Sequence, residues 1–143
     1  MKILVFLLSV LSFTSLAETT YNGDSNQIAA VEKAVNYYLK GSLLGDPDVI
    51  KKAFHPDAKV QGFARGKHSV YDIPTFLGFF SKDKPGKHEI NIVSVDIANS
   101  AASVRCEWDF GSWKYVDYLS LIKLDNEWKI VSKIYTIVKK DKK

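Results

Sequence analysis

The chain has 143 residues, a formal net charge of +4, one cysteine and 46% hydrophobic residues, a composition typical of a single globular domain. The net charge is small, and the sequence has no stripe of basic residues with aromatic residues between them, so a nucleic-acid partner is not expected. A lone cysteine excludes an intrachain disulfide. The three histidines lack the spacing of a metal site, so neither a metal nor a cofactor is expected.

The first seventeen residues are typical of an export signal. Lys2 precedes an apolar run shorter than the roughly 20 residues of a membrane-spanning helix. Ser15 and Ala17 fit signal-peptidase cleavage after Ala17, although a retained anchor helix is the alternative. We therefore expect a periplasmic or secreted protein with no stable membrane anchor after cleavage. Mass spectrometry of the exported chain should find Glu18 as its first residue, and an intact Met1 would contradict this prediction.

The chain is expected to divide into four parts. Residues 1–17 are the signal peptide, and residues 18–27 are a flexible N-terminal segment. Residues 28–138 form the folded domain, and residues 139–143 form a solvated basic tail.

Three helices are expected in the first half of the chain. The first begins at a cap on Asp24 and ends at Gly45, which can adopt a left-handed conformation. Asp46-Pro47 begins a short second helix with proline in its first turn. The third spans residues 72–80, and a short strand at residues 58–63 precedes it.

The second half of the chain has the pattern of a four-stranded antiparallel meander. Strands are expected at residues 89–98 and 101–110, followed by a long hairpin over residues 115–135. Asp125-Asn126 suits the two-residue turn of this hairpin because both residues tolerate positive φ. The order of the elements predicts an α+β fold, with three N-terminal helices packed on a curved antiparallel sheet.

The alternation of apolar and polar residues along these strands assigns one face of the sheet to the core. Its members are mostly apolar, among them Trp108, Leu119, Leu121, Ile130 and Ile134. Asp117 is the one carboxylate on this face, and a buried carboxylate is costly unless it is paired. Either it reaches water or a backbone donor near the sheet end, or it is an acid in a pocket.

The register of the last hairpin determines on which face of the sheet its polar residues lie. Counting pairs from the turn places Leu119 opposite Ser132 and Tyr118 opposite Lys133. Tyr118, Lys133 and Tyr135 then fall on the outer face. A longer loop before the hairpin, or a single bulge, would reverse this assignment.

The chain resembles the NTF2-like superfamily. The resemblance rests on the helix end at Gly45-Asp46, the run FHPDAKV at residues 54–60 and the run LIKLDNEWKIVSK at residues 121–133. It extends over residues 28–135 and is nearest to the "putative lumazine-binding", SnoaL-like group. It implies a cone, in which a strongly curved sheet wraps around helices with a pocket at the open end, and commonly a homodimer.

The resemblance also gives a test for isomerase activity, because ketosteroid isomerases belong to this superfamily. The tyrosine of their motif falls on Tyr38, but the base falls on Gly62 and the second acid on Ser120. A proton shuttle without its base cannot work by that mechanism, so no catalytic set is recognised. The same match implies that Ser120, Lys133 and Tyr135 face the pocket. The alternation of apolar and polar residues places them on the outer face instead, and the sequence leaves both assignments open.

We therefore expect an exported small-molecule-binding or interaction domain with an apolar pocket. The candidate ligand-binding residues are Tyr38, Trp108, Asp117, Tyr118, Lys133 and Tyr135. The alternative is a SnoaL-like enzyme of the cyclase, dehydratase or isomerase type that uses Tyr38 with Asp117 or His55. A further alternative is a scaffold whose sheet binds another protein. Apolar residues on both faces of the last hairpin predict a homodimer.

Overall fold

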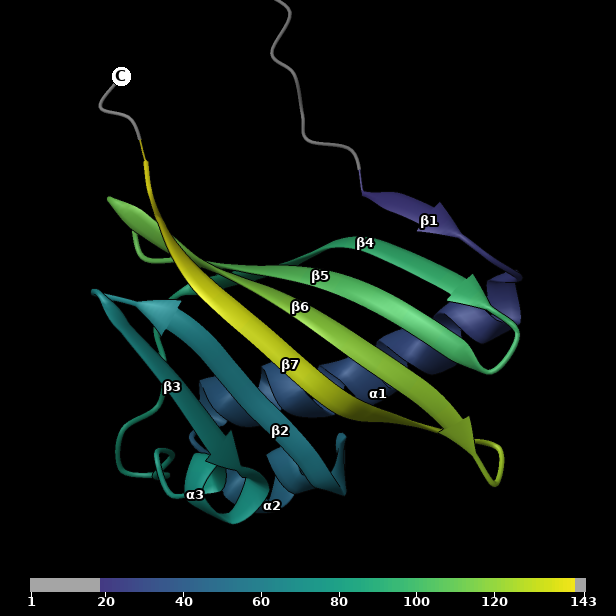
Figure 1. Ribbon diagram of the computed structural model, residues 1–143, viewed down its shortest axis with the longest axis horizontal. Coiled ribbons are helices and arrows are strands. Elements are labelled where there is room, and N and C mark those ends of the chain that lie inside the picture. Colours follow the sequence, from purple (N-terminus) through teal and green to yellow (C-terminus); the bar gives the residue numbers. More distant parts are fainter. Residues whose placement is uncertain (1–18, 141–143) are drawn as a thin grey trace, which may run out of the picture.

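A curved sheet wrapped around one long helix makes up the computed structural model, which describes residues 19–140 (Figure 1). The signal-peptide prediction for residues 1–17 lies outside the described residues. The strands are β1 Thr20–Asn22, β2 Phe54–Ala64, β3 Lys67–Asp72, β4 Glu89–Ala98, β5 Ala101–Asp109, β6 Trp113–Leu124 and β7 Glu127–Lys139. The helices are α1 Ser25–Leu44, α2 Pro47–Lys51 and α3 Ile73–Leu77.

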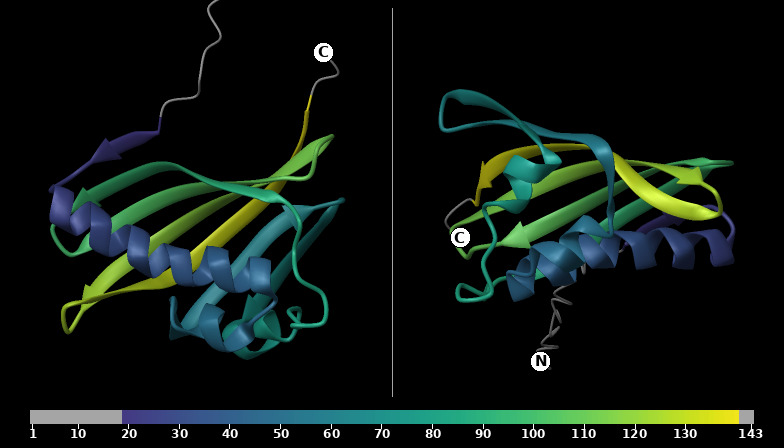
Figure 2. Two further views of the ribbon diagram at one scale, coloured as in Figure 1. Left: turned by 180° about the vertical axis from the view of Figure 1, so that it is seen from behind. Right: turned by 90° about the horizontal axis from the view of Figure 1, so that it is seen from below.

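The seven strands form one sheet in the order β1-β4-β5-β6-β7-β2-β3. Seen from behind, α1 crosses one face of this sheet, while α2 and α3 lie beside β2 and β3 near the end of α1 (Figure 2). The core lies between α1 and the sheet and includes Val31, Val35, Val104, Leu119 and Ile130. No helix among residues 19–140 is both long and apolar enough to span a membrane.

Both predicted ends of the first helix are confirmed. The Asp24 carboxylate accepts hydrogen bonds from the backbone N–H groups of Asn26 and Gln27, and α1 begins at the next residue. At the other end Gly45 has φ of 64°, and a Cβ there would lie 2.1 Å from the carbonyl oxygen of Ser81. Only glycine fits this position, since both the conformation and the space exclude a side chain.

The curved α+β architecture is confirmed, but the sheet is mixed rather than antiparallel. β1 pairs with β4 in parallel, and β2 pairs with β7 in parallel. The third helix is shorter than predicted and follows β2 and β3, so the three helices do not all precede the sheet. Residues 20–22, expected within a flexible segment, form a strand because the edge of β4 supplies partners.

The missed strand β3 is the second arm of a hairpin with β2. Arg65 and Gly66 both have positive φ, as a tight two-residue turn requires. Residues 67–72 are mostly polar and exposed at the sheet edge, so they lack the hydrophobic pattern that identifies a strand.

The last hairpin has the predicted turn but not the predicted register throughout. Asp125 and Asn126 have φ of 47° and 67°, and Leu121 pairs with Ile130 as expected. Ser120 then pairs with Ser132, which leaves Val131 as an extra residue in β7.

This bulge reverses the faces of β7 beyond Val131. Leu119 pairs with Lys133 and Tyr118 with Ile134, so the predicted pairs of Leu119 with Ser132 and of Tyr118 with Lys133 are wrong. Lys133 is only 5% exposed, whereas Ile134, assigned to the core, is 52% exposed. The alternation rule failed here because one inserted residue shifts every later side chain to the opposite face.

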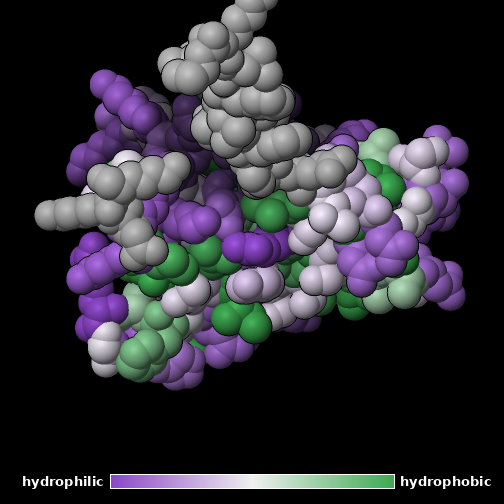
Figure 3. All heavy atoms as spheres, turned by 90° about the horizontal axis from the view of Figure 1, so that it is seen from above, coloured by the Kyte–Doolittle hydropathy of each residue, from purple (hydrophilic) through white to green (hydrophobic). Residues whose placement is uncertain are grey.

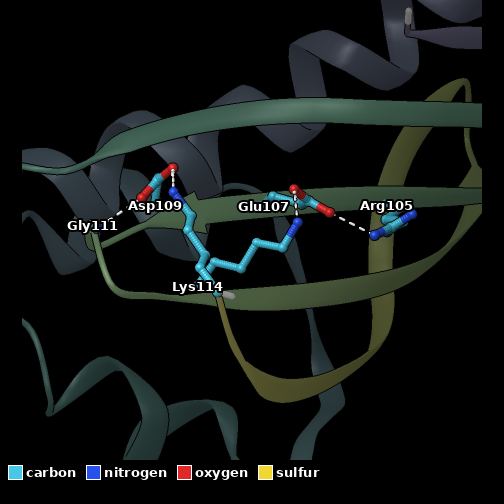
Figure 4. A network of polar contacts seen from close by, with 6 residues as sticks. Arg105, Glu107, Asp109, Gly111 and Lys114 are labelled. Carbon is cyan, nitrogen blue, oxygen red and sulfur yellow. Dashed lines mark hydrogen bonds and ion pairs between the residues drawn. The ribbon is translucent and has the colours of Figure 1, made fainter. Parts of the chain in front are cut away.

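The outer face of β5 and β6 carries a network of charged side chains (Figure 4). Glu107 pairs with Lys114 at 2.7 Å and with Arg105 at 2.5 Å. Asp109 accepts a hydrogen bond of 2.7 Å from the Gly111 N–H and supports the turn into β6. Viewed from above, hydrophobic groups on the surface are separated by polar ones (Figure 3).

Candidate functional site

A cavity of about 400 Å³, open to solvent on one side, is lined by residues of α1, α3, the segment after α3 and the strands β2, β3, β5, β6 and β7. Most of its wall is aromatic, including Phe76, Phe79, Phe80, Trp108 and Tyr115. The polar groups are few, as in most small-molecule sites. They are the hydroxyls of the lining tyrosines, the His88 imidazole, the Asp117 carboxylate and the Lys133 amine.

Three hydrogen-bond donors converge on the buried Asp117 carboxylate. The Tyr38 hydroxyl donates to Oδ2 at 2.7 Å, and Trp108 Nε1 donates to the same oxygen at 2.8 Å. Lys133 Nζ donates to Oδ1 and forms an ion pair with it. Asp117 is 1% exposed, so these donors replace the water that the carboxylate loses on burial.

Each member of this cluster comes from a different element. Tyr38 lies near the C-terminal end of α1, Trp108 in β5, Asp117 in β6 and Lys133 in β7. The bulge at Val131 is what turns Lys133 toward Asp117, since a regular hairpin would point it to the outer face. The cluster is therefore a product of tertiary pairing rather than of a local motif.

Burial governs the ionisation of this cluster. It raises the pKa of the Tyr38 hydroxyl well above the usual value, and the nearby Asp117 charge adds to this effect. Burial also lowers the pKa of the Lys133 ammonium, against the opposing attraction of Asp117. Cys106 lies opposite Asp117 on the neighbouring strand. Burial raises the pKa of its thiol, as expected of an unreactive cysteine in the core.

Five of the six candidate residues line the cavity: Tyr38, Trp108, Asp117, Lys133 and Tyr135. Tyr118 does not, because it is 49% exposed on the outer face. His55 also lies outside the cavity, and its Nδ1 accepts a hydrogen bond of 3.2 Å from the Asp57 N–H. The predicted pairing of Tyr38 with His55 is therefore wrong, whereas its contact with Asp117 is present.

The structure also shows why the isomerase motif is absent. A Cβ at Gly62 would lie 2.3 Å from the carbonyl oxygen of Tyr135, so no carboxylate can occupy that position without moving β7. Ser120 is exposed on the outer face and is not in the cavity wall. Of the residues matched to that motif, only Tyr38 lines the cavity.

Several lining residues were not among the candidates. His88 lies 5.3 Å from the Trp108 ring, measured between ring centroids, and burial lowers the pKa of its imidazole. Tyr71 and Phe79 make an edge-to-face contact, with ring centroids 5.0 Å apart, and both line the cavity. Their signal in the sequence was only the density of aromatic residues between 71 and 80, which also suits an ordinary core.

Comparisons with known proteins agree with this architecture. The family described as "Putative lumazine-binding" matches residues 26–136. One curated protein, Aldolase FrzH of Cladobotryum sp., is 25% identical over 114 residues, which cover 78% of this chain and 91% of that protein.

Solved structures give the same result. An NTF2-like protein of unknown function from Shewanella baltica OS155 is 25% identical with a TM-score of 0.73, covering 83% of this chain and all of that one (100%). A ketosteroid isomerase-like protein from Erwinia carotovora atroseptica shares the fold alone, at 15% identity and a TM-score of 0.65 over 82% of this chain and 100% of that one. Since the family match spans most of the sequence and the fold agrees, the chain belongs to the "Putative lumazine-binding" family of the NTF2-like superfamily.

Proposed function

We propose that the cavity binds a small, flat, neutral molecule that carries a carbonyl or hydroxyl group. The observation that carries this proposal is the buried cluster of Asp117, Lys133 and Tyr38 in the wall of an otherwise aromatic cavity. Aromatic walls suit flat rings, and a few polar groups suffice to orient such a ligand.

The charge balance of the cavity favours a neutral ligand. Asp117 and Lys133 offset one another, and the lowered pKa of His88 favours a neutral imidazole. A ligand carboxylate would have to compete with Asp117 for Lys133 and would be desolvated without a further cation. The family name refers to lumazine, a flat bicyclic heterocycle with carbonyl groups, which meets these requirements.

Lumazine titrated into the protein should therefore quench tryptophan fluorescence with a saturable 1:1 isotherm. Phe79→Ala should weaken this binding by roughly 1 kcal/mol, because it removes apolar contact area from the cavity wall. Phe63→Ala is the matched control, since Phe63 is equally exposed but lies outside the cavity. An unsaturable titration, or equal effects of the two variants, would count against the proposal.

A second candidate function is catalysis beside a carbonyl group. It is favoured by the name of the relative Aldolase FrzH and by the acid and base groups in the cavity. Such chemistry needs one group that polarises the carbonyl and another that moves a proton at the adjacent carbon. We expect the protein to accelerate exchange of the acetophenone methyl hydrogens in D₂O, as followed by NMR. A rate equal to that of buffer would remove this candidate.

We also propose that the protein is a homodimer formed through the outer face of β6 and β7. Tyr118 and Ile134 are exposed cross-strand partners there, and Ile122 lies further along the same face. Burial of such a patch against a second copy would remove it from water. Light scattering at micromolar concentration should give the dimer mass, and Ile134→Glu should give the monomer. A monomer mass for the unaltered protein would contradict this.

A further inference from the structure

We propose that Lys133 is a nucleophilic amine that captures an aldehyde or ketone in the cavity as a Schiff base. This inference rests on the proposed binding of a carbonyl compound and adds a covalent step to it. It assigns to Lys133 a role that a purely structural ion pair would not have.

The position of Lys133 is the first support. Its amine lies in the cavity wall, 4.9 Å from the Tyr135 ring centroid and 5.6 Å from that of Tyr38. Within residues 19–140, the one hydrogen-bond acceptor of Nζ is Asp117. An ammonium has three N–H donors, so the remaining directions around the nitrogen are left to the aromatic rings and the cavity.

The neighbours of Lys133 provide a route for its proton. An ammonium has no free electron pair, so it must lose a proton before it can attack a carbonyl. Asp117 Oδ1 is the acceptor in direct contact, and burial lowers the pKa of Lys133. Transfer to Asp117 leaves a neutral amine and a neutral carboxyl group, which removes two charges from a buried site.

The reaction then balances without an added oxidant or reductant. The Nζ electron pair bonds to the carbonyl carbon while the C=O π electrons move to oxygen, and one amine proton passes to that oxygen. The C–O bond then breaks, and the oxygen leaves as water with the proton held by Asp117. The products are an iminium on Lys133, ionised Asp117 and one water molecule, and the aromatic walls favour a carbonyl attached to a flat ring.

Benzoylacetone is a suitable probe, because a 1,3-diketone and an amine lose water to form a conjugated enaminone that absorbs in the near ultraviolet. Incubation with the purified chain should add one probe per protein by intact mass. Peptide mapping should place the adduct on Lys133 rather than on the surface lysines, because the lowered pKa of Lys133 leaves more of its amine in the neutral, nucleophilic form. Lumazine should slow the reaction by occupying the same cavity.

Two variants complete the experiment. Lys139→Met, which replaces an exposed lysine of the same strand, should leave the labelling rate unchanged. Asp117→Asn/Lys133→Met removes the amine while the asparagine oxygen can still accept from Tyr38 and Trp108, and it should abolish the adduct with the fold retained by circular dichroism. Labelling spread over surface lysines, or none while lumazine still binds saturably, would overturn the Schiff base alone. Failure of both probes would overturn the proposed function as well.

Discussion

Replacing Lys133 with methionine should lower the free energy of unfolding by about 3–5 kcal/mol, the largest effect expected from a single substitution in the cavity. Asp117 would keep its bonds from Tyr38 and Trp108 but would lose its cationic partner while remaining buried. A carboxylate left without a counter-charge in such a site is strongly destabilising. Urea unfolding followed by circular dichroism measures the loss.

Two controls separate this charge effect from a loss of side-chain packing. Lys139→Met on the same strand should change stability by less than about 0.5 kcal/mol, because that side chain is exposed. Asp117→Asn/Lys133→Met should recover part of the lost stability, since no buried charge is left unpaired. A double variant less stable than Lys133→Met would show that the ion pair is not the cause.

Tyr38→Phe should lower the free energy of unfolding by about 1.5–3 kcal/mol, the typical contribution of a hydrogen bond to a charged group. The substitution removes the 2.7 Å bond to Asp117 and almost no volume. Tyr37→Phe is the matched control, because Tyr37 is next to Tyr38 in the sequence but does not line the cavity. Equal stability of the two variants would contradict a structural role for the Tyr38 hydroxyl.

The same variant should change how stability depends on alkaline pH. The pKa of Tyr38 is raised above its usual 10.0, so above pH 10 the unfolded chain releases this proton while the folded chain keeps it. The contribution of the protonated Tyr38 hydroxyl to the free energy of unfolding is fully present below pH 10 and is lost as the pH rises toward the raised pKa. The lowered pKa of Lys133 has the opposite effect, since it makes folding more favourable as the pH rises. Lys133 is present in both wild type and Tyr38→Phe, so its effect cancels in the comparison. The difference between wild type and Tyr38→Phe should therefore shrink above about pH 10.

The parts of the fold that could be read from the sequence are those set by neighbouring residues. Asp24 and Gly45 begin and end α1 through caps that involve only adjacent backbone groups. Asp125 and Asn126 adopt the positive φ of the predicted turn. The alternation also assigned the core face of β5 correctly, because Ala102, Val104, Cys106 and Trp108 are all buried, as the pleat requires. In β4 the alternation is interrupted by a register shift between Ile92 and Ser94.

The candidate site was predictable only in part. Tyr38 and Asp117 were recognised because a tyrosine on an apolar helix face and a carboxylate on an apolar strand face both need polar partners. Their contact, and that of Lys133 with Asp117, joins residues far apart in the sequence. Nothing local indicated that His88 or Phe79 would reach the same cavity.

The sequence by itself determined the helix caps, the turns and most of the buried face, since these follow from the conformational preferences of single residues and their neighbours. Tertiary structure alone decided the parallel pairing of β2 with β7 and the extra residue at Val131. A bulge has no strong local signal, because it depends on how a strand fits both of its partners at once. That fit turns Lys133 inward against Asp117, and with it an apparently exposed lysine becomes part of the cavity.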